Sequence, residues 1–346
     1  MPTLNSEAFL APRLESIRRQ TFTNWELVVV DSQSDDQTIP MIEAFAEQGG
    51  AVRIYQGPRD GIYTNINRSI EYAQGQYVYI ATSDDTMAED CLEKMVEALD
   101  RHNNCGLAHC CLRMLDAQGV AVEDDWWPVR STFAQSSGNM LRQTHVRKAP
   151  YDGLLHMLGE TVYISLTQLL TRRSLFERIG MFRSDWGSIS DYYWDMRAGL
   201  AADTVHVGDT WASWRVHETQ ATASADIGQQ RHTDKASAMI TQALDDAKGD
   251  LSEAVLANLQ AWRSEAEELR HFLAQVQTVG GRSKRWSYVM GELLQGSTAA
   301  KRYIRGKMMQ NQSLPEHAPQ VVDGWLRAIG IEPMERAEAS GEVFTT

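Results

Sequence analysis

No apolar run in this sequence of 346 residues approaches the roughly 20 residues that a helix needs to cross a bilayer. The N-terminus also lacks a basic stretch followed by a hydrophobic one, which excludes an ordinary secretory signal. We therefore expect a cytoplasmic protein. Its hydrophobic content of 43% is ordinary for a globular chain with a sizeable core.

Positive charge is scarce, because 33 Lys and Arg residues face 46 Asp and Glu residues and leave a formal net charge of -13. Proteins that bind nucleic acids neutralise phosphates with a clustered excess of Lys and Arg. The composition therefore excludes nucleic acid as the main partner. It also indicates that a phosphorylated ligand would need a bridging cation.

Paired cysteines and glycine-rich signatures are missing as well. The four cysteines lack zinc-type spacing, and we expect them to be reduced thiols, as is usual in the cytosol. Neither the glycine-rich loop of dinucleotide enzymes nor that of P-loop NTPases occurs, and the nucleophile elbow of hydrolases is absent too. These absences exclude three large classes of enzyme.

Strand and helix patterns alternate in the first half of the chain. Residues 25–31 (WELVVVD) and 77–85 (YVYIATSDD) are valine-rich or β-rich segments that end in carboxylates, as buried parallel strands often do. Helical spacing covers residues 8–20, 39–47 and 63–73. The pattern predicts an α/β fold with a mostly parallel sheet flanked by helices.

Further along, residues 162–170 and 174–179 indicate a strand and then a helix, and 191–200 indicate another helix. Two short strands are expected at 204–207 and 210–216. Beyond about residue 226 the composition shifts to Ala, Gln, Glu, Leu and Arg with helical spacing. We therefore expect a catalytic domain over 1–229 and a helical appendage over 230–346, with a frayed tail at 335–346.

The adjacent carboxylates Asp84 and Asp85 follow a hydrophobic segment directly. Their hard oxygens suit Mg²⁺ or Mn²⁺, and such a cation can bridge the diphosphate of a ligand. The alternative is an ordinary solvated turn, where pairs of this kind are common. The position after a buried strand favours the metal.

Three spaced blocks of residues resemble the family-2 glycosyltransferases. The first comprises Pro2-Thr3-Leu4-Asn5, residues 14–17, and residues 25–31. The resemblance implies an A-type glycosyltransferase fold with a Rossmann-like nucleotide-binding half. It also implies that a nucleoside-diphosphate sugar is the donor, held by Thr3, Asn5 and Asp31.

The second block, residues 60–63, Asn67 and Ser83-Asp84-Asp85, is similar to the next signature of that family. By this resemblance Asp60, Asn67 and Asp84 contact the donor. Asp85 is then the direct ligand of a Mg²⁺ or Mn²⁺ cofactor.

The third block covers residues 171–182, Ser190-Asp191 and Arg197, and resembles the acceptor side of the family. It implies that Asp191 is the catalytic base, which takes a proton from the acceptor hydroxyl during an inverting transfer. A simple helix N-cap is the alternative for Asp191, and both roles can hold together. Asp195, one helical turn later, is the fallback base, and Asp185 is a weaker candidate.

The segment Trp214-Arg215-Val216-His217 is similar to the closing segment of the family, whose His completes the metal or diphosphate site. We therefore expect His217 at the metal, with an ordinary polar histidine as the alternative. A departure occurs at the start, where only Met1 precedes Pro2 and the first strand of the domain is expected to be truncated. A non-catalytic nucleotide-binding or glycan-binding relative, or a scaffold of a glycan-synthesis complex, therefore stays open.

Residues 282–307 carry seven basic residues among aromatic and aliphatic ones. A basic amphipathic surface can lie on anionic lipid, and this would suit a lipid-linked acceptor rather than a free glycan. The prediction is a possible peripheral contact with the inner face of the membrane. The alternative is a solvated helix face. The basic residues are Arg282, Lys284, Arg285, Lys301, Arg302, Arg305 and Lys307.

Overall fold

The computed structural model describes residues 1–126, 138–158, 160–218, 220, 229–261, 275–276, 279–297, 300–301 and 318–336. The chain forms two compact units, Met1–Asp250 together with Ile331–Thr346, and Leu251–Gly330. Each unit is described by itself. Among the helices that the structure describes, none combines the length and apolar composition that crossing a membrane requires.

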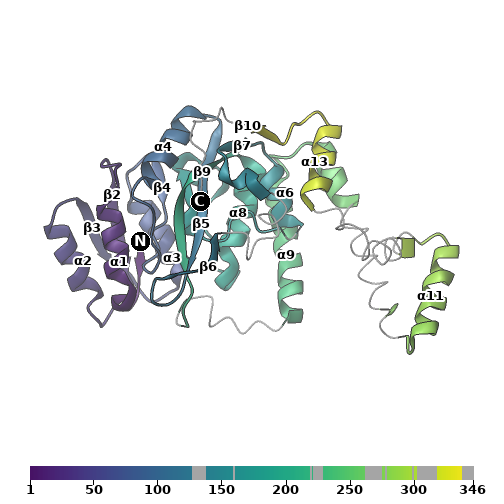
Figure 1. Ribbon diagram of the computed structural model, residues 1–346, viewed down its shortest axis with the longest axis horizontal. Coiled ribbons are helices and arrows are strands. Elements are labelled where there is room, and N and C mark those ends of the chain that lie inside the picture. Colours follow the sequence, from purple (N-terminus) through teal and green to yellow (C-terminus); the bar gives the residue numbers. More distant parts are fainter. Residues whose placement is uncertain are drawn as a thin grey trace. The chain divides into compact units, whose positions relative to one another are not determined.

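A small sheet of three parallel strands opens the first unit (Figure 1). Its strands are β1 (Pro2–Thr3), β2 (Glu26–Asp31) and β3 (Ala51–Gln56). Helices α1 (Glu7–Arg18), α2 (Thr38–Glu47) and α3 (Ile62–Tyr72) connect and follow them. The strand and helix alternation predicted from the sequence is confirmed here, with boundaries shifted by one or two residues.

The alternation of side chains along β2 explains how these layers pack. Leu27 and Val29 join the hydrophobic cluster that contains Leu10 of α1 and Phe45 of α2. The remaining valines of β2 point to the opposite face, as period-two geometry requires, and α3 packs along β2 and β1. The sheet is thus covered on both faces.

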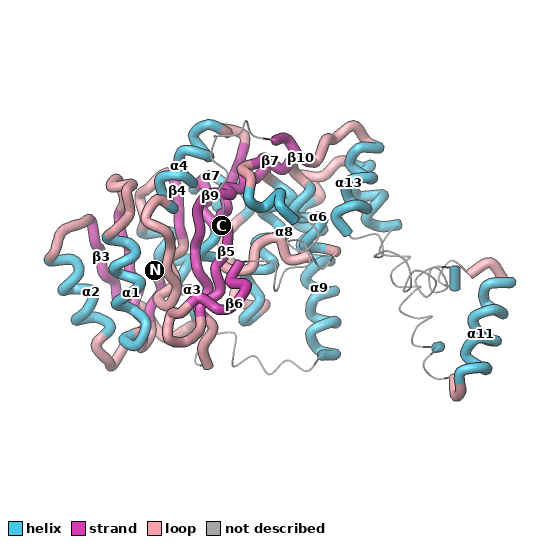
Figure 2. The backbone as a smooth tube through the Cα atoms, viewed as in Figure 1, coloured by secondary structure: helices cyan, strands magenta, loops and turns pink. Residues whose placement is uncertain are grey.

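A larger sheet has the strand order β10-β7-β9-β5-β8-β4, with β6 paired to β5. It is mixed rather than mostly parallel. Strands β5 and β9 lie side by side (Figure 2) and pair in parallel, whereas β4, β6, β7, β8 and β10 pair antiparallel with their described neighbours. The strands are β4 (Tyr77–Tyr79), β5 (Cys105–Leu115), β6 (Ala121–Trp126), β7 (His145–Arg147), β8 (Leu169–Arg172), β9 (Asp203–Arg215) and β10 (Met334–Arg336).

The two short strands expected at 204–207 and 210–216 are one irregular strand, β9. Its register against β5 slips where Val207 pairs with Cys110 and Trp211 pairs with Cys111. The residues between carry the glycine and polar positions that the sequence pattern indicated as a break. All four cysteines are free and buried, as expected.

The other helices of the first unit cover the larger sheet. They are α4 (Cys91–Arg101), α6 (Tyr151–Met157), α7 (Arg173–Ile179), α8 (Ser190–Ala201) and α9 (Gln229–Ala247), with short 3-10 turns at Gly138–Arg142, Leu166–Gln168 and Gly187–Ile189. Helices α6 and α8 approach closely, because a Cβ on Gly199 would meet the backbone nitrogen of Gly153 at 2.5 Å. Only glycine permits this contact.

The compact units do not follow the boundary expected at 229–230. Helix α9 packs against α8 within the first unit, which runs on to Asp250, and β10 pairs with β7. A distant segment completing a sheet leaves little trace in local composition, which explains the difference. The second unit contains α11 (Arg282–Leu294) and α13 (Ala318–Ala328).

At the N-terminus, the Met1 carbonyl oxygen accepts a hydrogen bond from the Val30 backbone N–H at 3.0 Å, so Met1 extends the pairing of β1 with β2.

A buried polar network lies between β5, β7, β9 and α6. The Arg147 guanidinium donates to Asp152 Oδ1 at 2.6 Å and Oδ2 at 2.9 Å, and also contacts His145 Nε2 at 2.8 Å. His206 Nδ1 lies 3.3 Å from His109 Nδ1. Burial is the main reason that the pKa values of these histidines are lowered. The network therefore favours neutral imidazoles.

Candidate functional site

Asp31 organises the turn at the C-terminal ends of β1 and β2. It is fully buried, and its Oδ1 accepts from the Thr3 hydroxyl at 2.9 Å and the Ser34 hydroxyl at 2.5 Å. Its Oδ2 accepts from the Ser34 backbone at 2.8 Å. Strands β1 and β2 pair in parallel, and Thr3 is the partner of Asp31 in their register. The carboxylate thus joins two strand ends and the following loop.

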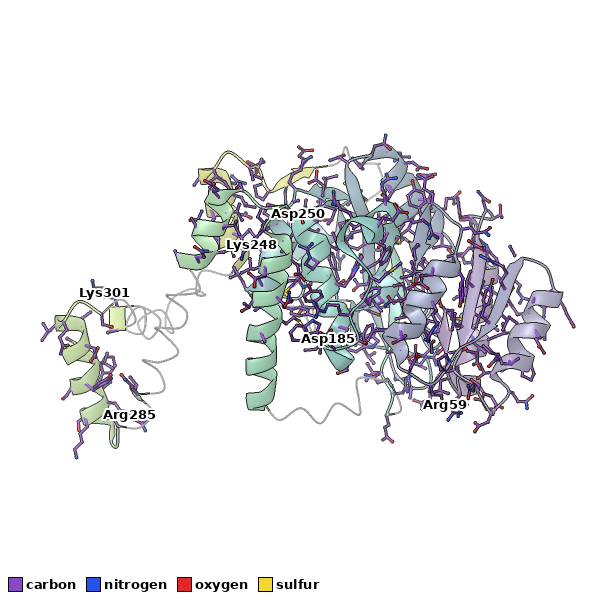
Figure 3. All side chains as sticks on the ribbon, turned by 180° about the vertical axis from the view of Figure 1, so that it is seen from behind. Arg59, Asp185, Lys248, Asp250, Arg285 and Lys301 are labelled. Atoms are coloured by element: carbon purple, nitrogen blue, oxygen red, sulfur yellow. The ribbon has the colours of Figure 1, made fainter. Side chains whose placement is uncertain are left out.

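Two residues of this turn have left-handed backbones, Asn5 with φ 49° and Gln33 with φ 60°. Asparagine tolerates this region, whereas glutamine there is an uncommon, strained choice. Asn5 Oδ1 accepts from the Asp35 backbone at 3.0 Å. Arg59, labelled in Figure 3, donates to the carbonyl oxygens of Ser32 at 3.1 Å and Gln33 at 2.7 Å. These contacts hold the loop in its strained form.

The loop after β4 carries the acidic pair. Asp85 is 2% exposed, its Oδ1 accepts from the Arg215 backbone at 2.7 Å, and its Oδ2 accepts from the Thr82 hydroxyl at 2.7 Å. Burial, and secondly the neighbouring Asp84 charge, raise the pKa of Asp85 to about 7. Asp85 thus links this loop to the end of β9.

Asp84 points to a different partner. Its Oδ2 lies 3.0 Å from His217 Nε2, and its side chain is 24% exposed while that of His217 is 7% exposed. The Arg215 Nε donates to the Asp84 carbonyl oxygen at 2.9 Å, which fixes the loop beneath. A carboxylate oxygen and an imidazole nitrogen therefore meet beside this loop.

Within the described residues, no group of three or more His, Cys, Asp and Glu side chains is arranged to hold a metal ion. Asp84 and His217 would therefore supply two ligands, and other ligands would have to come from a bound molecule or water. Mg²⁺ sites in phosphate-handling proteins are commonly built this way, with one or two carboxylates plus substrate phosphates. The donor set fits such a cation.

The strand-end turn and the acidic loop meet through the N-terminal end of α1. The Ser6 hydroxyl donates to the Ser83 hydroxyl at 2.9 Å. The Phe9 ring lies 4.1 Å from the His217 ring, centroid to centroid, and 5.4 Å from the Arg215 guanidinium carbon. Thr3, Asn5, Asp31, Asp84, Asp85 and His217 therefore belong to one continuous set of contacts.

Asp60 and Asn67 are engaged elsewhere. Asp60 pairs with Arg68 through contacts of 2.7 Å and 2.6 Å. The Asn67 amide donates to the Phe182 carbonyl at 2.7 Å and accepts from the Phe182 backbone at 3.1 Å. The Asn67 amide thus ties α3 to the segment before α8, and Asp60 is engaged by Arg68 rather than by the acidic loop.

Asp191 lies in the first turn of α8, where its Oδ1 accepts from the Tyr192 backbone at 2.8 Å. The Tyr63 hydroxyl of α3 lies beside the carboxylate and donates to the Ser188 carbonyl at 3.1 Å. Burial is the main cause that raises the pKa of Asp191. The N-cap of α8 is Ile189, so Asp191 lies just inside the helix and the alternative of a simple N-cap is wrong.

Helix α3 relates this carboxylate to the strand-end turn. Asn65, two residues after Tyr63, donates to the Ser32 hydroxyl at 2.6 Å, and Ser32 follows Asp31 directly. Asp185, the weaker alternative base, instead pairs with Arg183 at 2.6 Å and is exposed (Figure 3). The geometry thus separates Asp185 from Asp191.

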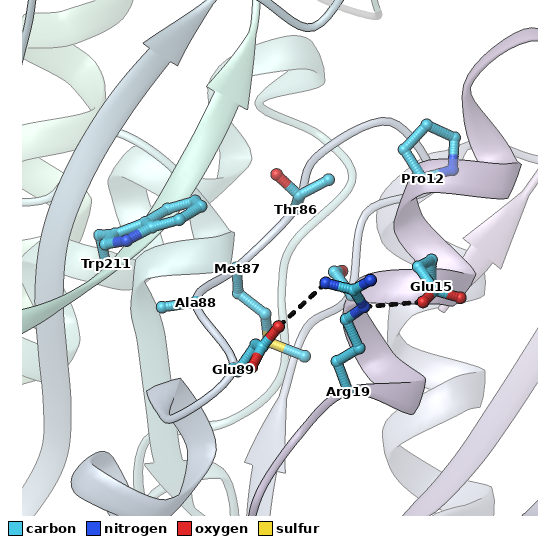
Figure 4. Close-up of a pocket in the computed structure, with 9 residues that line it drawn as sticks. Pro12, Glu15, Arg19, Thr86, Met87, Ala88, Glu89 and Trp211 are labelled. Atoms are coloured by element: carbon cyan, nitrogen blue, oxygen red, sulfur yellow. Dashed lines mark hydrogen bonds and ion pairs between the residues drawn. The ribbon is translucent and has the colours of Figure 1, made fainter.

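A pocket lies outside this set of contacts, between α1, the segment after the acidic loop, and β9 (Figure 4). Arg19 crosses it, donating to Glu15 at 2.8 Å and Glu89 at 3.0 Å, and Trp211 forms another side. None of the site residues expected from the sequence lines it.

Sequence reasoning missed several side chains of the site. Tyr63, Arg59 and Arg215 all stood within or next to the quoted blocks, yet their roles depend on contacts with residues more than 20 positions away. Ser83 belonged to the second block, but nothing in the sequence indicated that its hydroxyl contacts that of Ser6. Serine is common in loops, and only the fold brings these two together.

Comparisons with known proteins bear on the family and the fold. Residues 1–148 match the family model described as Glycosyl transferase family 2. A PGL/p-HBAD biosynthesis glycosyltransferase of Mycobacterium bovis is 33% identical over 111 residues, which are 32% of this chain and 43% of the relative. The putative glycosyltransferase EpsH of Bacillus subtilis is 24% identical over 217 residues, which are 62% of this chain and 58% of the relative.

The crystal structure of S. aureus TarS 1-349 in complex with UDP-GlcNAc aligns with a TM-score of 0.56 and 20% identity, covering 73% of this chain and 67% of that one. This likeness shows the fold, and the A-type glycosyltransferase fold expected from the sequence is confirmed. The chain spans less than half the length of the mycobacterial relatives that it matches.

Proposed function

Because residues 1–148 carry a glycosyl transferase family 2 domain, we propose that this protein transfers a sugar from a nucleoside-diphosphate sugar to an acceptor hydroxyl with inversion, in glycoconjugate biosynthesis. The observation that carries the proposal is the continuous contact between the Asp31 turn and the Asp84 and His217 pair through Ser6 and Ser83. Open α/β sheets bind nucleotides at the C-terminal ends of their strands, and this is where the contact lies.

The donor nucleotide would lie over the turn that Asp31 organises. Thr3 and Asp31 shape this turn, and Asn5 and Gln33 give it two left-handed backbone positions. Arg59 adds a cation beside it. Asp60 and Asn67 have no role in this proposal beyond holding α3, because their polar groups are already paired.

We assign the metal to Asp84 and His217 rather than to Asp85. Asp85 is almost fully buried and both of its oxygens accept hydrogen bonds, whereas Asp84 is partly exposed and already meets an imidazole nitrogen. A bound Mg²⁺ or Mn²⁺ would offset the charge that builds on the leaving diphosphate. Asp85 would hold the loop and the end of β9 in the geometry that presents Asp84.

Asp191 would act as the base. One carboxylate suffices in an inverting transfer, because it removes the proton of the acceptor hydroxyl as that oxygen attacks the anomeric carbon. The bond from that carbon to the diphosphate oxygen breaks, and its electron pair leaves with the diphosphate. A raised pKa makes the Asp191 carboxylate a stronger base than an exposed aspartate.

Release of a nucleoside diphosphate from a panel of sugar nucleotides, with Mn²⁺ and with a chelator, tests this function directly. Water replaces the acceptor in such an assay, so the acceptor need not be known. We expect slow hydrolysis of one donor that depends on the metal. Binding of a sugar nucleotide with no hydrolysis and no transfer would instead support the non-catalytic alternative.

The acceptor would be a glycan or a lipid-linked molecule, and α11 supports the second. Trp286, Met290 and Leu294 recur every four residues and are 41%, 44% and 85% exposed, whereas Val289 of the same helix is buried. Lys284, Arg285 and Lys301 are exposed in the same unit, and Figure 3 labels the last two. The side chains of Arg302, Arg305 and Lys307 lie outside the described residues.

We propose that this apolar stripe of α11, Trp286, Met290 and Leu294, rests on an anionic bilayer surface. Aromatic and aliphatic side chains enter the interface while neighbouring cations meet anionic headgroups. Charge complementarity supports this occupant, since the chain as a whole carries -13 and would be repelled from such a surface without a local basic segment.

A further inference from the structure

Asp195 is a buried carboxyl whose pKa is shifted by burial and by the Asp191 charge, with no cation of the described residues among the causes. Its residue is 6% exposed, and within the described part of the chain its Oδ1 has no hydrogen-bond partner. Arg197, two residues later, faces Asp250 at 3.5 Å. A carboxylate buried without a cation or several donors is costly, so the group is expected to take up a proton instead.

The position of Asp195 relates it to the proposed base. Asp191 and Asp195 stand one turn apart on α8, so both project to the same face of the helix. The Tyr63 hydroxyl of α3 is within reach of both charges. Burial, and secondly the charge of Asp191, raise the pKa of Asp195 well above its ordinary value. Both carboxyls are therefore shifted toward the protonated form, and the shift of Asp195 is the stronger one.

Other ionisable groups around the pair do not supply a positive charge. Tyr192 lies next to Asp195 and near Glu160, and its hydroxyl donates to the His156 carbonyl oxygen. His156 is fully buried, and burial lowers its pKa to about 3. Burial likewise raises the pKa of Tyr63 and of Tyr192. The surroundings are thus neutral or acidic at neutral pH.

We propose that Asp195 stays protonated and positions the base, donating its carboxyl hydrogen toward the Asp191 carboxylate. A neutral carboxyl is a hydrogen-bond donor, and a donor beside Asp191 both orients that carboxylate and favours its ionised form. This inference rests on the proposed function, in which Asp191 takes the proton of the acceptor or of water. The proton of Asp195 does not move during the reaction.

Two substitutions separate this role from a structural one. Asparagine has the shape of a protonated aspartate and keeps a donor, so Asp195→Asn should retain metal-dependent donor hydrolysis within about threefold. Leucine removes the donor, so Asp195→Leu should lower kcat about tenfold or more while the KM for the sugar nucleotide stays unchanged. Thermal unfolding of both variants checks that the fold is retained.

The pH profile gives the sign of the interaction. Loss of a donor makes the Asp191 carboxylate easier to protonate, so the acidic limb of kcat should move to higher pH in Asp195→Leu and stay in place in Asp195→Asn. A limb that moves to lower pH in both variants would mean that Asp195 is ionised and repels the base, which overturns the proposal. An unmoved limb and unchanged kcat in the leucine variant would overturn it too.

Asp191→Asn is the control for the function itself. Retention of full turnover in that variant would refute the assignment of the base and hence the proposed function. A strong loss in Asp191→Asn combined with a wild-type profile in Asp195→Leu would refute only the role of Asp195. The two failures are therefore distinguishable in one assay, nucleoside diphosphate release with Mn²⁺ as a function of pH.

Discussion

The Asp84 Oδ2 and His217 Nε2 atoms lie 3.0 Å apart although 133 residues separate them in the sequence. The contact joins the loop after β4 to the end of β9, so it depends on the larger sheet being correctly formed. Asp85, the direct neighbour of Asp84, faces the other way into the Arg215 backbone and the Thr82 hydroxyl. Two adjacent carboxylates thus have different surroundings and should respond differently to substitution.

Asp84→Ala should abolish most metal-dependent turnover, by roughly a hundredfold or more, because it removes a carboxylate that would bind the cation. The side chain is partly exposed, so the melting temperature should change little. Donor hydrolysis as a function of Mn²⁺ concentration, together with thermal unfolding, measures both effects.

Asp85→Ala is the matched comparison. It leaves the Arg215 backbone and the Thr82 hydroxyl without their acceptor, which should cost about 1–3 kcal/mol of unfolding free energy. The Mn²⁺ concentration that gives half of the remaining turnover should stay near that of the wild type. A large increase in that concentration would indicate that Asp85 is the metal ligand.

Asp191→Asn should spare the binding of the sugar nucleotide and reduce transfer by about 10²–10⁴-fold, because asparagine cannot accept the proton of the acceptor. Thermal stabilisation by the donor with Mn²⁺ reports binding, and nucleoside diphosphate release reports turnover. In the wild type, turnover should fall as the pH drops through a pKa above the usual value for aspartate of about 3.9, since burial raises this pKa and the base must be ionised.

The buried histidine network should make the fold sensitive to acid. His109, His145 and His206 have folded-state pKa values below the unfolded value, so the folded state binds fewer protons. Their contribution is fully present above about pH 6.5 and is lost as the pH falls toward the folded value. For His145 that value is about 4.

Denaturant unfolding between these pH values should therefore show a steadily falling free energy of unfolding. His145→Phe should reduce the slope and also lower stability at neutral pH, because the Arg147 guanidinium loses a partner at 2.8 Å. A free energy that is flat over this range would contradict the neutral state of the network.

The triple substitution Trp286→Ser, Met290→Ser and Leu294→Ser should weaken the binding of the full chain to vesicles that contain phosphatidylglycerol, as measured by sedimentation. Wild-type binding should fall at high salt, because headgroup attraction is screened, and should be weak on phosphatidylcholine alone. Val120→Ser, at a residue that is 61% exposed in the other unit, is the matched control and should have no effect. Binding of the triple variant equal to that of the wild type would refute the membrane contact. A finding that the stripe instead pairs two copies of the chain would refute it too.

Much of the region around the three-stranded sheet could be predicted from local pattern. The run of valines in β2 ends at Asp31, and the flanking helical periodicities match α1, α2 and α3 closely. These elements are local, with strands and helices that follow each other directly. The strands of the larger sheet could not be ordered this way, since β10 pairs with β7 across almost 190 residues. The hydrophobic periodicity of a segment identifies it as a strand but does not show which strand it pairs with.

The sequence alone decided which chemical groups stand after the strands and in the first turn of α8. For this reason Thr3, Asp31, Asp84, Asp85, Asp191 and His217 could be named as candidates. Only the tertiary structure decided which of two adjacent aspartates meets His217, and that Asn67 spends its amide on the Phe182 backbone. The physical reason is that side-chain direction, burial and competition for hydrogen-bond partners depend on segments distant in the chain. A sequence lists the chemical groups, whereas packing determines which of them remain available to a ligand.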